Sequence, residues 1–486
     1  MAPGSEQLPL QNKGIFHNLP TFSPELKDLT AIVTGANGIS GFHTMRVLLE
    51  SPQRWKKVWA ASRRPPPEEM MALLSEEQRA RVEHVACDFL AKPEEIAAQL
   101  KDKGVKAEYI FFYSYAQPKP KPGAGAWSNA QELVDTNSAL LSNFLGALDL
   151  AKITPKRFLL QTGAKNCEHT DWFHPSHLTD APAKSVTHQL ETVGVRCYLT
   201  IYNTYSPHHL RYAGTHLGPA RTPYVESDPR VTLEPNFYYP QEDLLWKYCD
   251  EHKSDWNVVC PGWIIGAVNN AAMNALHPLA VYAAVQAHKG EKLNYPGDYT
   301  AWMSVTEHST AMLTGYLSEW AVLNDKCKNN KFNSSDTCPI PNNRLWPELA
   351  RWYGCKGYGG PELDESKLNV IDPGDVPTPL GFGPSRKLRY AWTLSGWAQD
   401  PANAKAWKEI MEKHKVTHNP FNDIEAHFTF GDFAAWGPAF ALSMNKARCF
   451  GWTGHVDTLE SLHLAYSELS KIGMLPPPVA DAKPMI

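Results

Sequence analysis

The sequence lacks the long apolar runs of membrane proteins and the basic excess of nucleic-acid-binding proteins. None of its 486 residues falls in a stretch approaching the ~18 apolar residues of a membrane span. Lysine and arginine number 47 against 51 aspartates and glutamates, so the formal net charge is −4 and no basic field attracts nucleic acid. We therefore expect neither a membrane nor a nucleic acid as a partner.

Cysteine is also scarce and unpatterned. The nine cysteines are scattered without a CxxC pair, which is typical of free thiols in a reducing compartment. Residues 1–24 are polar, contain proline and have no apolar signal-peptide core. The pattern predicts a cytoplasmic protein whose residues 1–27 form a leader that either lies on the next domain or is disordered.

What the sequence does contain is a strand, a glycine-rich turn and a helix in immediate succession. The apolar run 29–33 leads into TGANGISG at 34–41, and helical apolar spacing follows. Gly35 allows the tight turn, Gly38 lets a pyrophosphate approach the backbone, and Gly41 lets the helix pack on the strand. The N–H groups at the helix start bind the phosphate charge. The predicted dinucleotide contacts are Thr34, Gly35, Asn37, Gly38, Ile39 and Gly41.

The end of the next expected strand indicates which dinucleotide binds. Residues 58–62 have the pattern of a strand that ends in Arg63 and Arg64 instead of an acidic residue. An acidic residue would bind the ribose 2′-hydroxyl of NAD, whereas arginine accommodates the 2′-phosphate of NADP. We therefore predict NADP(H), bound through Ser62, Arg63 and Arg64; two solvated loop arginines are the alternative. Asp88 ends a third strand, where it could contact adenine.

Strands and helices alternate over residues 28–165, which predicts an α/β fold with a Rossmann-type, doubly wound parallel sheet. Past residue 270 the alternation weakens into helices, loops and tryptophans. We expect an NADP-binding Rossmann domain at 28–270. A smaller, mainly helical substrate-binding lobe is expected at 271–486, with late segments returning to the Rossmann core.

Residues 167–211 interrupt this pattern. They hold six of the nineteen histidines and show no sustained periodicity. A metal site built from these histidines is one interpretation, but their spacing fits no usual ligand pattern, and we predict no metal. A disordered surface insertion is the second. A retained intron is the third, because Cys167-Glu168 can be encoded by TGT GAG, which contains a common intron start.

A tyrosine near the nicotinamide is expected from the chemistry. Hydride transfer to a carbonyl or enone requires an acid near the developing oxyanion, and a tyrosine beside a lysine can supply it. The usual YxxxK spacing is absent from the expected helix, where Asp243 stands in the lysine position four residues after Tyr239. Lys165, at the end of the fifth strand, could reach the tyrosine from the other side. We favour Tyr239 on this spacing, with Tyr238 as the alternative.

Together these motifs resemble the progesterone 5β-reductase/iridoid synthase-like (PRISE) branch of the extended short-chain dehydrogenase/reductase family. The resemblance covers roughly residues 28–475, apart from the 167–211 block. The matching segments are TGxxGxxG at 34–41, Arg63-Arg64, Cys87-Asp88, LQTGxK at 160–165, NFYYxxED at 236–243, PGxIxG at 261–266 and Met444 to Trp452.

The resemblance implies NADPH-dependent reduction of the activated C=C bond of a small apolar enone or enal. Tyr239 would stabilise the enolate and Lys165 would tune that tyrosine. Thr162, Pro261 and Ile264 would border the cofactor, and a homodimer is possible. A carbonyl reductase or epimerase on the same fold, or a cofactor-binding sensor without turnover, are the alternatives. Expected liners of the substrate pocket are Trp263, Trp302, Met303, Phe433 and Trp436.

Overall fold

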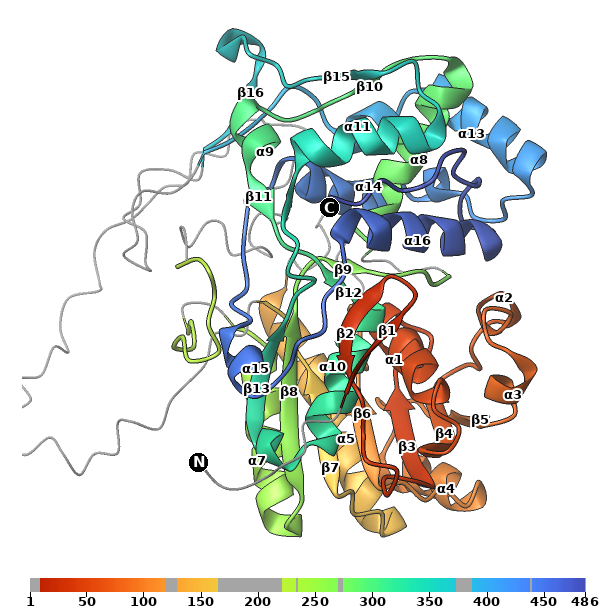
Figure 1. Ribbon diagram of the computed structural model, residues 1–486, viewed down its shortest axis with the longest axis vertical. Coiled ribbons are helices and arrows are strands. Elements are labelled where there is room, and N and C mark those ends of the chain that lie inside the picture. Colours follow the sequence, from red (N-terminus) through yellow and green to blue (C-terminus); the bar gives the residue numbers. More distant parts are fainter. Residues whose placement is uncertain are drawn as a thin grey trace, which may run out of the picture.

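The computed structural model describes most of the chain as two lobes. A sheet lobe lies below a helical lobe in Figure 1. Lys165 and the whole 167–211 block lie outside the described residues. The described residues are 9–118, 129–164, 221–232, 235–269, 274–372, 387–437 and 439–485.

The sheet lobe contains seven parallel strands in the order β13-β8-β7-β6-β3-β4-β5. Chain order runs outward in both directions from the β3–β6 pair, so the topological switch point lies at the carboxyl ends of these two strands. This arrangement confirms the predicted Rossmann-type α/β fold. The strands are β3 (Leu29–Thr34), β4 (Trp55–Ser62), β5 (Val82–Ala86), β6 (Tyr109–Phe112), β7 (Arg157–Gln161), β8 (Asp255–Pro261) and β13 (Asn330–Ser334).

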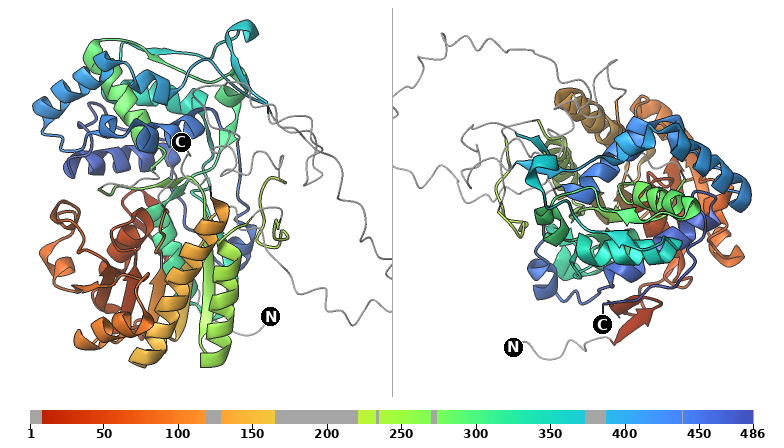
Figure 2. Two further views of the ribbon diagram at one scale, coloured as in Figure 1. Left: turned by 180° about the vertical axis from the view of Figure 1, so that it is seen from behind. Right: turned by 90° about the horizontal axis from the view of Figure 1, so that it is seen from above.

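Helices cover both faces of the sheet, which is why its central strands are almost continuously apolar. All four residues of β6 are buried. One face carries α1 (Ile39–Leu49) against α10 (Ala311–Leu323). The other carries α4, α5 and α7, and Figure 2 shows α5 and α7 side by side. These helices, with two short ones beside β4 and β5, are α2 (Glu68–Met71), α3 (Glu76–Arg79), α4 (Pro93–Asp102), α5 (Ala130–Ala151) and α7 (Tyr238–His252).

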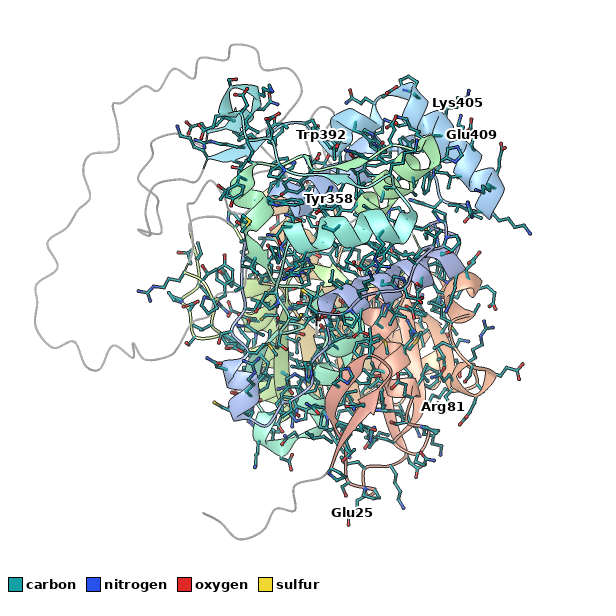
Figure 3. All side chains as sticks on the ribbon, turned by 45° about the horizontal axis from the view of Figure 1, so that its top comes forward. Glu25, Arg81, Tyr358, Trp392, Lys405 and Glu409 are labelled. Carbon is teal, nitrogen blue, oxygen red and sulfur yellow. The ribbon has the colours of Figure 1, made fainter. Side chains whose placement is uncertain are left out.

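Residues beyond 270 contribute to both lobes, because β13 pairs with β8 and α10 packs on α1. Among the described helices, none combines the length and apolarity that a bilayer crossing demands. Lys405 and Glu409 mark α13 on the helical lobe in Figure 3, and Glu25 and Arg81 mark the sheet lobe. The remaining helices are α8 (His277–Lys289), α9 (Tyr299–Met303), α11 (Asn342–Tyr353), α12 (Leu394–Ala398), α13 (Pro401–His414), α14 (Ile424–Trp436), α15 (Asn445–Cys449) and α16 (Thr458–Lys471).

Short strands and single turns complete the fold. β9 and β12 pair in parallel between the two lobes, where Figure 1 labels them. These strands are β9 (Ile264–Ile265), β10 (Leu293–Asn294), β11 (Val305–Thr306), β12 (Ser309–Thr310), β14 (Ile340–Pro341), β15 (Tyr358–Gly359), β16 (Asn369–Ile371) and β17 (Leu388–Tyr390). The 3-10 turns are η3 (Asp325–Cys327), η4 (Glu365–Lys367) and η5 (Pro420–Asn422).

The described part of the expected leader forms a hairpin of β1 (Leu10–Lys13) and β2 (Phe16–Pro20) that packs on the sheet lobe. The Phe16 ring is buried, with its centroid 5.5 Å from that of Tyr316 on α10. This segment therefore belongs to the hydrophobic core and is not a detached tail.

The helical lobe holds a cluster of histidine rings. His277 of α8 and His418 have ring centroids 5.3 Å apart, and His418 and His427 of α14 have centroids 4.9 Å apart. Burial lowers the pKa of His277 to about 3 and that of His418 to about 4. The pKa of His427 is also lowered by burial. The rings are therefore neutral at pH 7, and protonating them would place charge in a packed interior.

We expect the free energy of unfolding to fall as the pH drops from about 6.5 to 4. Each histidine whose pKa is lowered in the native state makes its full contribution to stability above its unfolded pKa of about 6.5. As the pH falls below this value, the contribution declines by about 1.4 kcal/mol per pH unit until the folded pKa is reached. Burial raises the pKa of Asp336 to about 7, which has the opposite sign over the same range. Urea unfolding of the wild type and His277→Gln isolates one histidine, because Asp336 is common to both. Parallel pH profiles for the two proteins would contradict this prediction.

Candidate active site

The glycine turn lies at the switch point, at the start of α1. Gly35 has φ +61°, and a Cβ added there would lie 2.9 Å from the carbonyl oxygen of Tyr113 after β6. A Cβ on Gly41 would collide with the Gly35 carbonyl, so α1 crosses the turn closely. At Gly38 a Cβ would approach only the Gly35 oxygen, at 3.3 Å, among the described atoms. Gly38 is the N-cap residue of α1, which starts at Ile39. Because it is a glycine, no side chain of the N-cap residue hydrogen-bonds the first N–H groups of the helix. The fit suits a phosphate group at the helix start.

Polar side chains predicted to contact the cofactor also hold the turn in place. Thr34 is buried, and its Oγ1 accepts the N–H groups of Tyr113 (3.0 Å) and Ser114 (3.2 Å). The Asn37 amide donates to the Arg64 carbonyl at 2.9 Å, and the Ser62 hydroxyl donates to the same oxygen at 2.7 Å. The loop after β4 is thereby fixed beside the glycine turn.

Arg63, Arg64 and Asp88 are all exposed, but their surroundings differ. Arg63 and Arg64 are exposed, beside the glycine turn. Asp88 is exposed too, and its Oδ1 accepts the Leu90 N–H at 3.1 Å. The structure therefore brings the arginines to the expected position, while the Asp88 carboxylate caps its own turn.

The ends of β7 and β8 carry further residues that the sequence predicts to border the cofactor. Thr162 is buried, with its hydroxyl 3.2 Å from the Cys260 sulfur, and the Pro261 carbonyl accepts the Ala164 N–H at 2.9 Å. Ile264 is half-buried in β9. One contact was missed from the sequence: Gln161 donates to the Ser40 hydroxyl at 2.8 Å and links β7 to the first turn of α1. The available signal was a polar residue directly after the apolar run 158–160.

The structure distinguishes the two tyrosines of the NFYY segment. A Cβ added to Gly163, two residues after the end of β7, would lie 2.7 Å from the Tyr238 hydroxyl oxygen. This hydroxyl therefore rests on the glycine backbone two residues before Lys165. Tyr239 is buried instead, and its hydroxyl accepts the Val231 N–H at 2.9 Å. The geometry favours Tyr238 over Tyr239, against the spacing argument from Asp243.

The acidic pair after these tyrosines anchors α7. The Arg230 guanidinium donates to Asp243 at 2.8 Å and to Glu242 at 3.0 Å. Glu242 also forms a fully buried ion pair with Lys331 of β13, with Nζ and Oε1 2.6 Å apart. Asp243 is thus a structural partner of Arg230, and sequence reasoning missed the whole network. Two adjacent acids on one helix turn gave no indication of partners 12 and 89 residues away from Glu242.

The expected pocket liners lie in different environments. Trp263 lines a small cavity between the lobes. Met303 is 46% exposed, and Phe433 and Trp436 are buried and stack with ring centroids 5.8 Å apart. Trp302 packs edge-on against Tyr295 at 4.9 Å. In the described part of the chain, no three His, Cys, Asp or Glu side chains are placed to hold a metal ion.

Comparisons with known proteins agree with this architecture. The family model of the PRISE-like Rossmann-fold domain matches residues 180–373. The short chain dehydrogenase gsfE of Penicillium aethiopicum is 25% identical over 454 residues, which cover 92% of this chain and 99% of the relative. The (S)-8-oxocitronellyl enol synthase of Catharanthus roseus is 23% identical over 435 residues, covering 89% and 88%.

A third relative is the 3-oxo-Delta(4,5)-steroid 5-beta-reductase of Arabidopsis thaliana. It is 25% identical over 309 residues, which cover 60% of this chain and 72% of the relative. The resemblance drawn from the motifs is therefore confirmed by the family model and by named relatives. The chain is therefore similar to PRISE-like proteins and to enzymes named as short-chain dehydrogenases and reductases.

Proposed function

We propose that this enzyme uses NADPH to reduce the activated C=C bond of a small apolar enone or enal. The observation that carries the proposal is the Tyr238 hydroxyl, which rests on Gly163 at the carboxyl end of β7. Beside it, the ends of β3 and β6 form the switch-point crevice with its open glycine turn. Relatives named as an enol synthase and a steroid 5-beta-reductase support the same chemistry.

The cofactor site is proposed from the residues around the turn. The uncapped start of α1 and the open face of Gly38 would bind the pyrophosphate. Arg63 and Arg64 would bind the 2′-phosphate, which selects NADPH over NADH. Bound NADPH supplies the hydride that reaches the β-carbon of the substrate. Pro261 and Ile264 lie at the nicotinamide side in this proposal.

Tyr238 is the proposed catalytic residue. Its hydroxyl donates a hydrogen bond to the substrate carbonyl oxygen and stabilises the negative charge that develops there as the enolate forms. Lys165 follows Gly163 by two residues, and we propose that its ammonium stabilises the charge on the Tyr238 oxygen. Tyr239 and Asp243 keep α7 in position through Val231 and Arg230.

The test is NADPH oxidation with simple enones and enals, with the products identified. A saturated ketone or aldehyde is the expected product. An allylic alcohol would establish a carbonyl reductase, and NADPH binding without turnover of any enone would favour the sensor interpretation. The same assay on a chain lacking residues 167–211 tests that block: equal activity shows a tolerated insertion, and activity in the shortened chain alone shows that the block is foreign to the enzyme.

Replacing both arginines by alanine is expected to raise the KM for NADPH by about 10- to 100-fold. The two exposed guanidiniums together lose charge-assisted hydrogen bonding to the 2′-phosphate worth about 1.5–3 kcal/mol. The KM for NADH, which lacks this phosphate, should change little. Steady-state kinetics with each cofactor give the ratio of the KM for NADPH to the KM for NADH. The control is Arg79→Ala, which removes an exposed pair with Glu68 away from the turn. An equal rise for both cofactors would contradict a 2′-phosphate role for Arg63 and Arg64.

A further inference from the structure

Three aromatic rings form a row between the loop after β6 and the start of α7. The centroid of the Phe237 ring is 4.4 Å from that of the Tyr238 ring and 5.6 Å from that of the Tyr115 ring. Tyr115 follows the carboxyl end of β6, whereas Phe237 and Tyr238 stand at the start of α7. All three residues are half-buried. Tyr238 is thus connected to the loop after β6 through one intermediate ring.

Hydrogen bonds hold the loop that carries Tyr115. The buried Asn137 of α5 binds both backbone groups of Ala116, because its Oδ1 accepts the Ala116 N–H at 2.9 Å and its Nδ2 donates to the Ala116 carbonyl at 3.0 Å. The backbone carbonyl of Asn137 accepts the side-chain amide of Gln241 on α7 at 2.8 Å. The loop and the start of α7 are therefore fixed to the same point of α5, and Tyr115 offers Phe237 a fixed surface to pack against.

The direction of the Tyr238 side chain depends on this packing. Phe237 is the N-cap residue of α7, and its side chain makes no capping hydrogen bond. Asn236 fixes the backbone instead, because its Oδ1 accepts the Tyr238 N–H at 3.1 Å. A fixed backbone still leaves a side chain several rotamers, among which its neighbours select one. The ring of Phe237 restricts this choice, and the Tyr238 hydroxyl comes to rest on Gly163.

We propose that Tyr115 is a positioning residue, which holds the Tyr238 hydroxyl over Gly163 through the ring of Phe237. This inference rests on the proposed function, in which the Tyr238 hydroxyl stabilises the enolate oxygen. The Tyr115 hydroxyl donates to the Gln117 side chain in its own loop, so the ring of Tyr115 and not its hydroxyl carries the effect. Displacing a catalytic group by about 1 Å can lower the rate by about a hundredfold.

The test measures NADPH oxidation with oct-2-enal in Tyr115→Leu and Tyr115→Phe. We expect Tyr115→Leu to lower kcat by about 10- to 100-fold and to leave the KM for NADPH unchanged, because the glycine turn is untouched. Tyr115→Phe keeps the ring, so its kcat should stay within a few-fold of the wild-type value. The control is Phe22→Leu, which removes a half-buried ring 4.2 Å from the guanidinium of Arg54, the residue before β4, and should leave kcat unchanged. Equal losses of kcat in Tyr115→Phe and Tyr115→Leu would overturn the role of the ring.

A double-mutant cycle shows whether Tyr115 acts through Tyr238. The catalytic hydroxyl is already absent in Tyr238→Phe, so adding Tyr115→Leu should lower kcat no further. Phe237→Leu removes the middle ring and should reproduce the effect of Tyr115→Leu; it carries the test if Tyr115→Leu does not fold. If Tyr115→Leu instead raises the KM for oct-2-enal and keeps its full effect beside Tyr238→Phe, the ring contacts the substrate and the positioning role is overturned.

A structural measurement separates this inference from the proposed function. Crystal structures of the wild type, Tyr115→Leu and Tyr115→Phe show whether the Tyr238 hydroxyl lies on Gly163. If no enal is reduced but the hydroxyl leaves Gly163 in Tyr115→Leu alone, the positioning role stands and the reductase proposal fails. If oct-2-enal is reduced but Tyr115→Leu changes neither the place of the hydroxyl nor kcat, the reductase stands and the positioning role fails.

Discussion

Tyr238→Phe is expected to lower kcat for enone reduction by about 10²- to 10³-fold, the usual effect of removing one oxyanion donor. The hydroxyl rests on the Gly163 backbone at the carboxyl end of β7, beside the crevice. Substrate KM should change less, because the hydrogen bond strengthens as charge develops in the transition state. Stopped-flow measurement of NADPH oxidation separates the hydride step from product release.

Tyr239→Phe is the matched control, one residue away on the same helix. Its hydroxyl accepts the Val231 N–H in a buried position. Removing it should therefore lower the free energy of unfolding by about 1–3 kcal/mol, while kcat stays within a few-fold of the wild-type value. The reverse result, a catalytic collapse in Tyr239→Phe and normal turnover in Tyr238→Phe, would restore the assignment suggested by the Asp243 spacing.

Lys331→Met is expected to destabilise the protein by about 3–5 kcal/mol, because it leaves the Glu242 carboxylate buried without its closest cation. Both side chains of this pair have 0% exposure. Arg230 remains 3.0 Å from Glu242 and partly compensates its charge. The expected loss therefore lies toward the lower end of that range. Chemical denaturation followed by tryptophan fluorescence measures the change.

The double variant Glu242→Met, Lys331→Met tests the cause. Replacing both charges by apolar groups of similar volume removes the uncompensated ion, so the double variant should be more stable than Lys331→Met. Lys247→Met, which breaks an exposed pair with Glu251 on the same helix, should leave the unfolding midpoint unchanged. A double variant less stable than the single one would show that packing around Lys331, not its charge, supports α7.

The sequence by itself determined the fold class and the glycine turn between the first sheet strand and α1. The glycine turn at 34–41 requires particular local geometry, and the structure places Gly35 at positive φ and Gly41 against the Gly35 carbonyl. The arginines after β4 were predictable for the same reason, since they follow the strand directly. Both features depend on residues that are close together in the chain, so they can be recognised in the sequence.

Only the tertiary structure shows where the hydroxyls of Tyr238 and Tyr239 lie and what Asp243 contacts. Adjacent residues of a helix point about 100° apart, so Tyr238 and Tyr239 cannot both face β7, and the choice depends on how α7 packs on the sheet. The partners of the acidic pair, Arg230 and Lys331, come from a separate loop and from an edge strand. These contacts join residues far apart in the chain, and packing of the whole molecule selects them.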